Sequence, residues 1–165
     1  MLQPSTEFRV LPVGDTCRWA DDTHIATLSV ENTFTMAAQT KIYGVRAHLD
    51  PIKAQLSDVI HSCVVEALEF PADKRAHRFF PLDASDFFYP AGRTEHYTII
   101  EISIFKGRST QAKKRLIRLL YERIQAKLGI SPQDVEVTIA ETPRHNWGLR
   151  GSPADEVELG YKIDV

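Results

Sequence analysis

Apolar residues recur at helical spacing in two segments of the chain. The first segment follows Asp50-Pro51, and its apolar stripe consists of Ile52, Leu56, Val59, Ile60, Cys63, Val64, Ala67 and Leu68. The second follows Gly107-Arg108-Ser109, and its stripe consists of Leu116, Ile117, Leu120, Ile124 and Leu128. An apolar residue at every third or fourth position is typical of a helix with one buried face. The pattern therefore predicts two amphipathic helices.

The residues that flank the two stripes predict where the helices begin and end. Asp50 suits the N-cap of the first helix, and Pro51 suits its first helical position, where no backbone donor is needed. Ser109 is the predicted N-cap of the second helix. Gly129 is the predicted end of that helix, because glycine adopts the left-handed conformation at low cost.

Each predicted helix follows a predicted strand, at residues 41–48 and 97–105. The two halves, about 40–78 and 97–141, correspond at an offset of about sixty residues, which indicates an internal repeat. Each half is predicted to be a β-α-β unit with a right-handed crossover. The expected fold class is therefore α/β (α+β): a tandem β-α-β repeat with a four-stranded sheet and two helices on one face.

The remaining segments carry weaker patterns. Residues 79–94 include the aromatic cluster Phe87, Phe88 and Tyr89 and are predicted to form a loop or short hairpin. Residues 157–163 alternate apolar and polar positions, which predicts an edge strand where subunits pair. Residues 1–36 are predicted to be an N-terminal extension, with 37–165 as the main domain. Met36 is then a possible alternative start, because the regular pattern begins after it.

Composition narrows the class of protein. The 165 residues, 43% of them hydrophobic, suffice for one well-packed domain. A net charge of −2 gives no electrostatic case for nucleic acid or an anionic membrane, and no apolar run is long enough to cross a bilayer. Cys17 and Cys63 predict neither a disulfide framework nor a zinc site. With no secretory signal in the first residues, a cytoplasmic location is expected.

Gly107-Arg108-Ser109 is the first candidate for chemistry. A strand that runs into a helix N-terminus places backbone N–H groups and the positive end of the helix dipole beside an arginine. A carboxylate suits this arrangement, since the guanidinium donates two parallel hydrogen bonds to it. Lys106 is two residues earlier and points from the same side of the strand end. The alternative is an ordinary helix start with a solvated arginine.

Three short motifs, spaced along the chain as in a known protein family, carry a resemblance to that family. They are Lys-Gly-Arg-Ser at 106–109, Ser-Pro-Gln-Asp-Val at 131–135 and Asn146-Trp147. Together they resemble the tautomerase superfamily (4-oxalocrotonate tautomerase and macrophage migration inhibitory factor-like proteins), in the branch of malonate semialdehyde decarboxylase. The resemblance covers roughly residues 40–155. It implies the tautomerase fold, a homotrimer with pockets near the subunit boundaries, a small-molecule carboxylate as ligand, and neither cofactor nor metal.

The resemblance also implies roles for individual residues. Arg108 would hold the carboxylate, Lys106 or Arg75 would stabilise enolate charge, and Trp147, which follows Asn146, would form a wall of the pocket. In relatives, an acid and then an arginine follow the same Pro-Ala. Here Arg75 matches that arginine, but Lys74 stands at the position of the acid and Asp73 comes one residue early. Lys74 and Asp73 also suit a solvated loop.

The family's amino-terminal proline has no equivalent at the expected position. Counting back from Asp50 places it at Gln39 or Thr40, which can hydrogen-bond a substrate but are not general bases. The proton would then need another carrier, such as His145, Asp73 or water. The sequence thus predicts a weak tautomerase-like enzyme, acting on a small 2-oxo or unsaturated carboxylic acid by tautomerisation, decarboxylation or hydration. The alternative is a non-catalytic trimer that binds small acids or serves as a scaffold.

Overall fold

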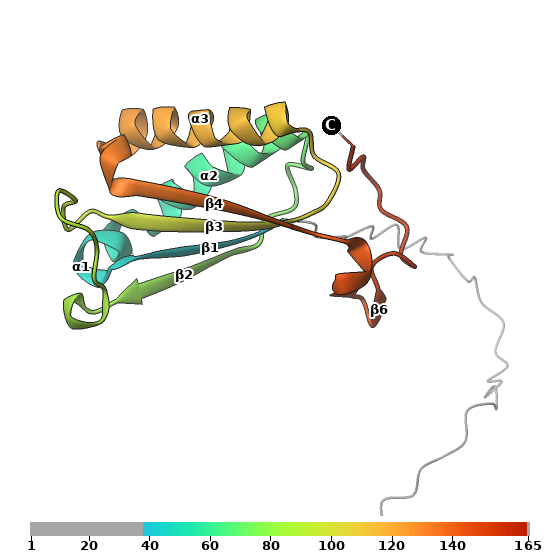
Figure 1. The fold of residues 1–165 in the computed structure, drawn as a ribbon, viewed down its shortest axis with the longest axis horizontal. Coiled ribbons are helices and arrows are strands. Elements are labelled where there is room, and N and C mark those ends of the chain that lie inside the picture. The colour runs from blue at the N-terminus through green and yellow to red at the C-terminus, as the bar shows by residue number, and fades with distance from the viewer. Residues whose placement is uncertain (1–37, 165) are drawn as a thin grey trace, which may run out of the picture. The chain divides into compact units, whose positions relative to one another are not determined.

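Four strands form one mixed sheet, and two long helices cover one of its faces (Figure 1). The computed structural model describes residues 38–164. The predicted boundary between an extension and the main domain, with Met36, lies outside these residues and stays a prediction. The strands are β1 (Ala38–Val45), β2 (His77–Leu82), β3 (Thr98–Phe105) and β4 (Val135–Thr142). Their order across the sheet is β2-β1-β3-β4.

The sheet is built from two similar halves, as the sequence predicts. β1 pairs in parallel with β2, β3 pairs in parallel with β4, and the two halves meet where β1 and β3 run antiparallel. β1 and β3 are eight residues each and have the same alternation of buried and half-buried side chains. This alternation arises because successive side chains in a strand point to opposite faces, and the helices cover only one face. The predicted fold class is confirmed.

The helices α2 (Lys53–Leu68) and α3 (Thr110–Leu128) pack side by side on the sheet. Their apolar stripes supply much of the core, including the fully buried Ile60 and Leu120. The predicted ends of α3 are confirmed: the Ser109 hydroxyl accepts a hydrogen bond from the Ala112 amide, and Gly129 has φ of 70°. Within residues 38–164, neither helix is long and apolar enough to span a membrane.

The predicted start of the first helix is wrong. The chain becomes helical directly after β1, in α1 (Arg46–Leu49), and continues through the short η1 (Asp50–Ile52) into α2. Asp50 has helical angles of −58° and −43°, so it is not an N-cap, and its carboxylate pairs with Lys53 instead. The additional turn buries Leu49, which is 2% exposed, in the core.

The aromatic segment is shorter than predicted. Residues 79–82 belong to β2, and the loop begins after Leu82 with a short turn, η2 (Ala84–Asp86). Phe87 is buried, and its ring lies 5.9 Å from that of Tyr97. Phe88 is 88% exposed. Aromatic packing onto Tyr97 thus fixes one part of this loop.

The predicted edge strand at 157–163 is absent from the structure. After β4 the chain forms η4 (Arg144–Asn146) and a small hairpin of β5 (Gly148–Leu149) and β6 (Ser152–Pro153), and then runs irregularly to residue 164. The Arg144 guanidinium binds the carbonyl groups of Ala154 and Val157, which directs this segment back onto the domain. Its apolar side chains, Leu159, Tyr161 and Ile163, therefore pack on the core instead of forming a sheet edge.

His77 makes the stability of the fold depend on pH. It begins β2, its Nδ1 lies 2.8 Å from the Ser57 hydroxyl, and its ring centroid lies 6.2 Å from that of His61. Burial, and then the charges of Arg75 and His61, lower the pKa of His77 from 6.5 to about 4. Between these values the unfolded chain binds a proton that the folded chain resists, so this contribution to stability falls as pH drops from about 6.5 to about 4.

We therefore expect the urea concentration at the unfolding midpoint to decrease as the pH falls from about 6.5 to about 4. His77→Gln should make this midpoint depend less on pH. Unfolding both proteins at pH 7, 5.5 and 4 measures this difference. Equal pH slopes for the two proteins would contradict the assignment to His77.

Candidate functional site

The connection between β3 and α3 places an arginine beneath the C-terminal segment. Gly107 has φ of 142°, a conformation that side-chain-bearing residues rarely adopt. A Cβ atom there would lie 2.8 Å from both Asp164 Oδ1 and Ile163 Cγ2. The C-terminal segment thus lies directly over this turn, and only glycine leaves room for it. Arg108 comes next, just before the cap of α3.

Arg108 is a buried cation without hydrogen-bond partners. The residue is 4% exposed, and its side-chain nitrogens Nε, Nη1 and Nη2 are buried and donate to no acceptor. Burial lowers the pKa of this guanidinium, although a guanidinium stays charged in proteins. An unpaired buried charge is costly, so such groups are normally paired. A planar carboxylate would satisfy two of these N–H groups at once, which makes Arg108 a candidate anion-binding residue.

Tyr161 lies beside Arg108. Its hydroxyl is also buried without a partner, and although the two groups interact electrostatically, no hydrogen bond of standard geometry joins them. Burial raises the pKa of Tyr161 to about 12, against the opposing effect of Arg108 and Arg144. The hydroxyl therefore keeps its proton at neutral pH and is available as a donor.

Glu141, near the end of β4, adds a carboxylate to the same turn. One oxygen pairs with Lys113 Nζ at 2.7 Å, and the other is buried without a partner. Burial by itself would raise the pKa of this carboxyl, but Lys113 and the backbone N–H groups of Gly107 and Arg108 outweigh it and lower the pKa. Glu141 is therefore ionised at neutral pH and is a hydrogen-bond acceptor, but the lowered pKa makes it a weaker base than an ordinary carboxylate.

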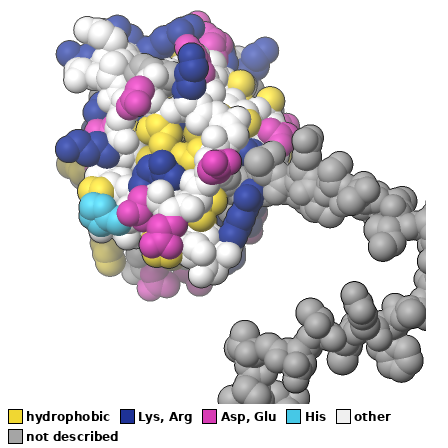
Figure 2. Space-filling view, turned by 90° about the vertical axis from the view of Figure 1, so that its right-hand side faces the viewer, with side chains coloured by type: hydrophobic (Ala, Val, Ile, Leu, Met, Phe, Trp, Pro, Cys, Tyr) yellow, Lys and Arg dark blue, Asp and Glu magenta, His cyan; other side chains and the backbone are white. Residues whose placement is uncertain are grey.

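Aromatic side chains line the surroundings of this turn. The ring of Trp147 meets that of Phe105 edge-on at 5.0 Å, and its indole N–H donates to the Thr142 hydroxyl. The ring of Tyr161 meets that of Phe70 at 5.7 Å. Figure 2 shows this end of the molecule, where apolar, basic and acidic side chains lie close together. The site thus combines a buried cation, a donor, an acceptor and apolar walls.

Comparisons with known proteins identify relatives of this chain. A family model described as "Tautomerase enzyme" matches residues 74–150. The 2-hydroxymuconate tautomerase of Pseudomonas putida is 34% identical over 59 residues, which are 36% of this chain and 94% of that protein. The chain belongs to the tautomerase family. The probable tautomerase YusQ of Bacillus subtilis (strain 168) is 28% identical over 109 residues, 63% of this chain and 86% of the relative.

Solved tautomerase-family structures share the fold. A wild-type fused 4-OT, described as an asymmetric trimer, superposes with a TM-score of 0.64 at 27% identity and covers 71% of this chain and 96% of its own. A malonate semialdehyde decarboxylase superposes with a TM-score of 0.63 at 24% identity. The match covers 70% of this chain and 93% of the decarboxylase chain. The predicted tautomerase fold is therefore confirmed.

The basic and acidic residues that the sequence predicts for a carboxylate site lie in different surroundings. Lys106 is exposed, and its amide donates to the Thr142 carbonyl. Arg75 is exposed and pairs with Asp58 of α2 at 2.7 Å. Asp73 is also exposed, whereas its neighbour Lys74 is 6% exposed and lies 5.0 Å from the centroid of the Tyr161 ring. Lys74, and not Asp73, thus points to the Arg108 region.

The other predicted binding residues are spread along β1 and η4. The Gln39 amide oxygen accepts a hydrogen bond from Arg78 at 2.9 Å, and Thr40 is 1% exposed. His145 and Asn146 are exposed. Of the residues predicted from sequence, Arg108 is buried in the candidate site, and Trp147 packs on the strand that leads into it.

Sequence reasoning missed Tyr161, Glu141 and the burial of Lys74. Glu141 could have been found from the sheet, because parallel pairing of β3 with β4 places it opposite Ile104, four residues before Arg108. Tyr161 carries no such signal, since its position depends on the path of an irregular segment.

A surface cavity lies elsewhere on the domain. A cavity of about 390 Å³ is bounded by α2 and α3, and its lining includes Asp58 and Arg123. Both have charged partners, Arg75 and Glu66, respectively. These two charged side chains of the cavity are therefore paired, unlike Arg108.

Proposed function

We propose that this protein is an enzyme that binds a small 2-oxo or unsaturated carboxylic acid at Arg108. It would catalyse keto–enol tautomerisation or the related decarboxylation or hydration, in the manner of the malonate semialdehyde decarboxylase branch. One observation carries the proposal: the Arg108 guanidinium is buried with no hydrogen-bond partner at any of its three nitrogens. A carboxylate is the planar anion that satisfies two of its N–H groups at once.

Proton transfer in this proposal uses groups other than a proline. The start of β1 holds Ala38, Gln39 and Thr40, so no proline stands there. Glu141 is the ionised carboxylate beside Arg108, and we assign it the role of proton acceptor. Tyr161 is the protonated donor, suited to an enolate oxygen. Since no amine base with a lowered pKa is involved, we expect slow turnover.

The proposal includes a homotrimer. The fused 4-OT with the same fold is described as a trimer. On β1 and β3, the side chains that alternate with the core positions are only half-buried, so this face of the sheet is free for another subunit. The mass of the protein in solution tests this assembly, and the mass of a single chain would exclude it.

Arg108→Ala tests the proposed function. We expect wild-type protein to ketonise phenylenolpyruvate or 2-hydroxymuconate, with kcat/KM at least about 100-fold lower in the variant, because the anion loses its charged donors. Ultraviolet absorbance measures both reactions. Arg118→Ala is the matched control, since Arg118 is an exposed arginine of α3. Equal turnover by wild-type protein and Arg108→Ala would refute the assignment of the site.

The absence of proline from Ala38, Gln39 and Thr40 favours a second candidate, a non-catalytic protein that binds small acids. Calorimetric titration with the same carboxylates distinguishes the two. Binding that requires Arg108 but produces no turnover supports the binding protein. Neither binding nor turnover would exclude both functions.

A further inference from the structure

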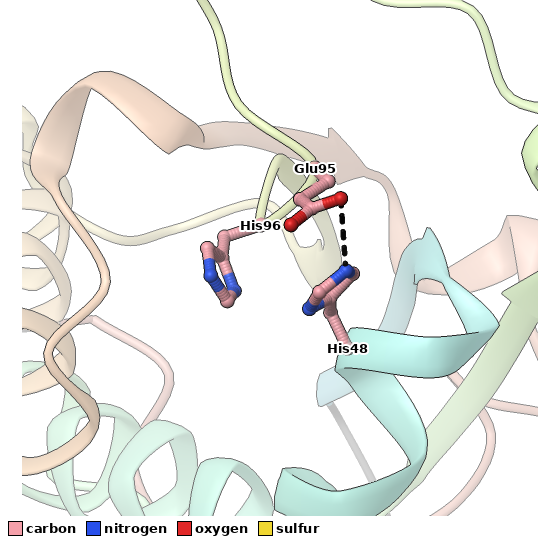
Figure 3. A group of neighbouring side chains, drawn as sticks. All are labelled: His48, Glu95 and His96. Atoms are coloured by element: carbon pink, nitrogen blue, oxygen red, sulfur yellow. Dashed lines mark ion pairs between the residues drawn. The ribbon is translucent and has the colours of Figure 1, made fainter.

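Two histidines and a glutamate converge near the end of β1 and the start of β3 (Figure 3). Arg108 follows the other end of β3, so it lies at the opposite end of the sheet. His48 extends from α1, and Glu95 and His96 extend from the turn that precedes β3. One ligand atom from each residue lies within 4.8 Å of the other two. His48 Nε2 is 3.3 Å from Glu95 Oε2, and the two imidazole rings are 4.5 Å apart. The three residues come from segments 47 positions apart that the fold brings together.

These distances suit a small divalent cation. Ligand atoms about 2.0–2.1 Å from a tetrahedral zinc ion are roughly 3.3–3.4 Å from one another. The separation of His48 Nε2 from Glu95 Oε2 has this value, and a ring nitrogen of His96 lies within 4.8 Å of both ligand atoms. All three residues also line a cavity of about 10 Å³, which is close to the space that one water molecule or ion needs.

The turn that carries two of the three residues is held firmly. Thr94 donates from its amide, at 2.7 Å, and from its hydroxyl, at 2.8 Å, to the carboxylate of Asp134. Asp134 is 4% exposed, so this anchor belongs to the core. The Thr94 carbonyl accepts from the Tyr97 amide, and the Thr94 hydroxyl accepts from the His96 amide. Glu95 and His96 therefore start from a fixed backbone, which reduces the entropy lost when a ligand binds.

We propose that His48, Glu95 and His96 form a zinc site with one open coordination position. Two neutral imidazoles and one carboxylate are a ligand set that zinc accepts, and water would complete the tetrahedron. Sequence patterns gave no hint of this site, because its ligands lie in two distant segments and include no cysteine. A bound ion would link the first turn after β1 to the turn before β3, so it would stabilise the folded state.

The zinc site is independent of the proposed carboxylate site. Glu95 and His96 lie just before β3 begins, and Arg108 follows just after β3 ends. Eight residues of strand separate these ends by about 25 Å. The two proposals can therefore fail separately, since Arg108→Ala removes one site and His96→Gln removes the other.

Isothermal titration of the full chain with Zn²⁺ tests the proposal. We expect wild-type protein to bind zinc at this site and to unfold at a higher temperature when zinc is present. His96→Gln should weaken this binding at least about tenfold and reduce the thermal shift. Glu95→Gln should act in the same direction. Both side chains are exposed, so neither change threatens the fold.

His145→Gln provides the matched control, because His145 is an exposed histidine outside the cluster. The proposal is supported if this variant binds zinc like the wild type while His96→Gln does not. It is overturned if wild-type protein gives no zinc binding. It is also overturned if His96→Gln and His145→Gln bind zinc equally well, since the ion would then be held elsewhere.

Discussion

Arg108→Met is expected to raise the free energy of unfolding of the ligand-free protein by about 1–4 kcal/mol while abolishing carboxylate binding. Methionine is similar in length and flexible enough to fill the buried space that the Arg108 side chain occupies. The substitution removes a charge that is buried without hydrogen-bond partners. A site that gains stability when its functional residue is lost is typical of a binding pocket that awaits its ligand.

Urea unfolding with and without a carboxylate measures both effects. The ligand should raise the midpoint of the wild type and leave that of Arg108→Met unchanged. Arg115→Met is the control, because Arg115 is exposed and pairs with Glu66 at 2.9 Å; its stability should change by less than about 1 kcal/mol. A less stable Arg108→Met protein would mean that the folded protein pairs Arg108 in solution.

Leu120→Ala is expected to lower the free energy of unfolding by about 2–5 kcal/mol. Leu120 is fully buried on the face of α3 that packs against the sheet and α2. Shortening it removes apolar area and leaves a cavity between elements that cannot collapse completely. Chemical unfolding in urea, followed by circular dichroism, measures the loss.

The neighbouring Leu119→Ala separates burial from helix propensity. Leu119 lies in the same helix and is only partly buried, so the change in propensity is equal and the loss of packing is smaller. We expect Leu119→Ala to cost less than half as much as Leu120→Ala. Equal losses from both variants would show that the core does not depend on the face of α3 that the structure buries.

Local and periodic features of the chain were predicted well. The apolar stripes of α2 and α3 survive in the structure because helical periodicity and burial agree along both helices. Ser109 and Gly129 were predicted correctly as the ends of α3, since capping depends on a few neighbouring residues. The repeat also indicated the topology of the sheet. The turn before α3 also led to Arg108, which is buried in the structure and whose role stays a prediction.

Features that depend on remote contacts were not predicted. The helix begins before Asp50 because burying Leu49 favours an additional turn, which the local cap signal does not reveal. The C-terminal segment forms no strand because Arg144 binds its carbonyl groups. This path brings Tyr161 to Arg108, and no periodicity around Tyr161 encodes that meeting.

The central pairing of the sheet relates its two ends by an approximate half-turn. β1 and β3 run antiparallel and pair so that Lys41 faces Glu101, two residues sixty positions apart. Rotation about that pair carries the end of β3 onto the end of β1, so the turn that holds Arg108 and the helix α1 that holds His48 follow equivalent strand ends. The chain continues differently after each end, which places a buried cation after β3 and a proposed cation ligand after β1. The two ends lie about 25 Å apart, so a substitution at one end leaves the side chains at the other end in place.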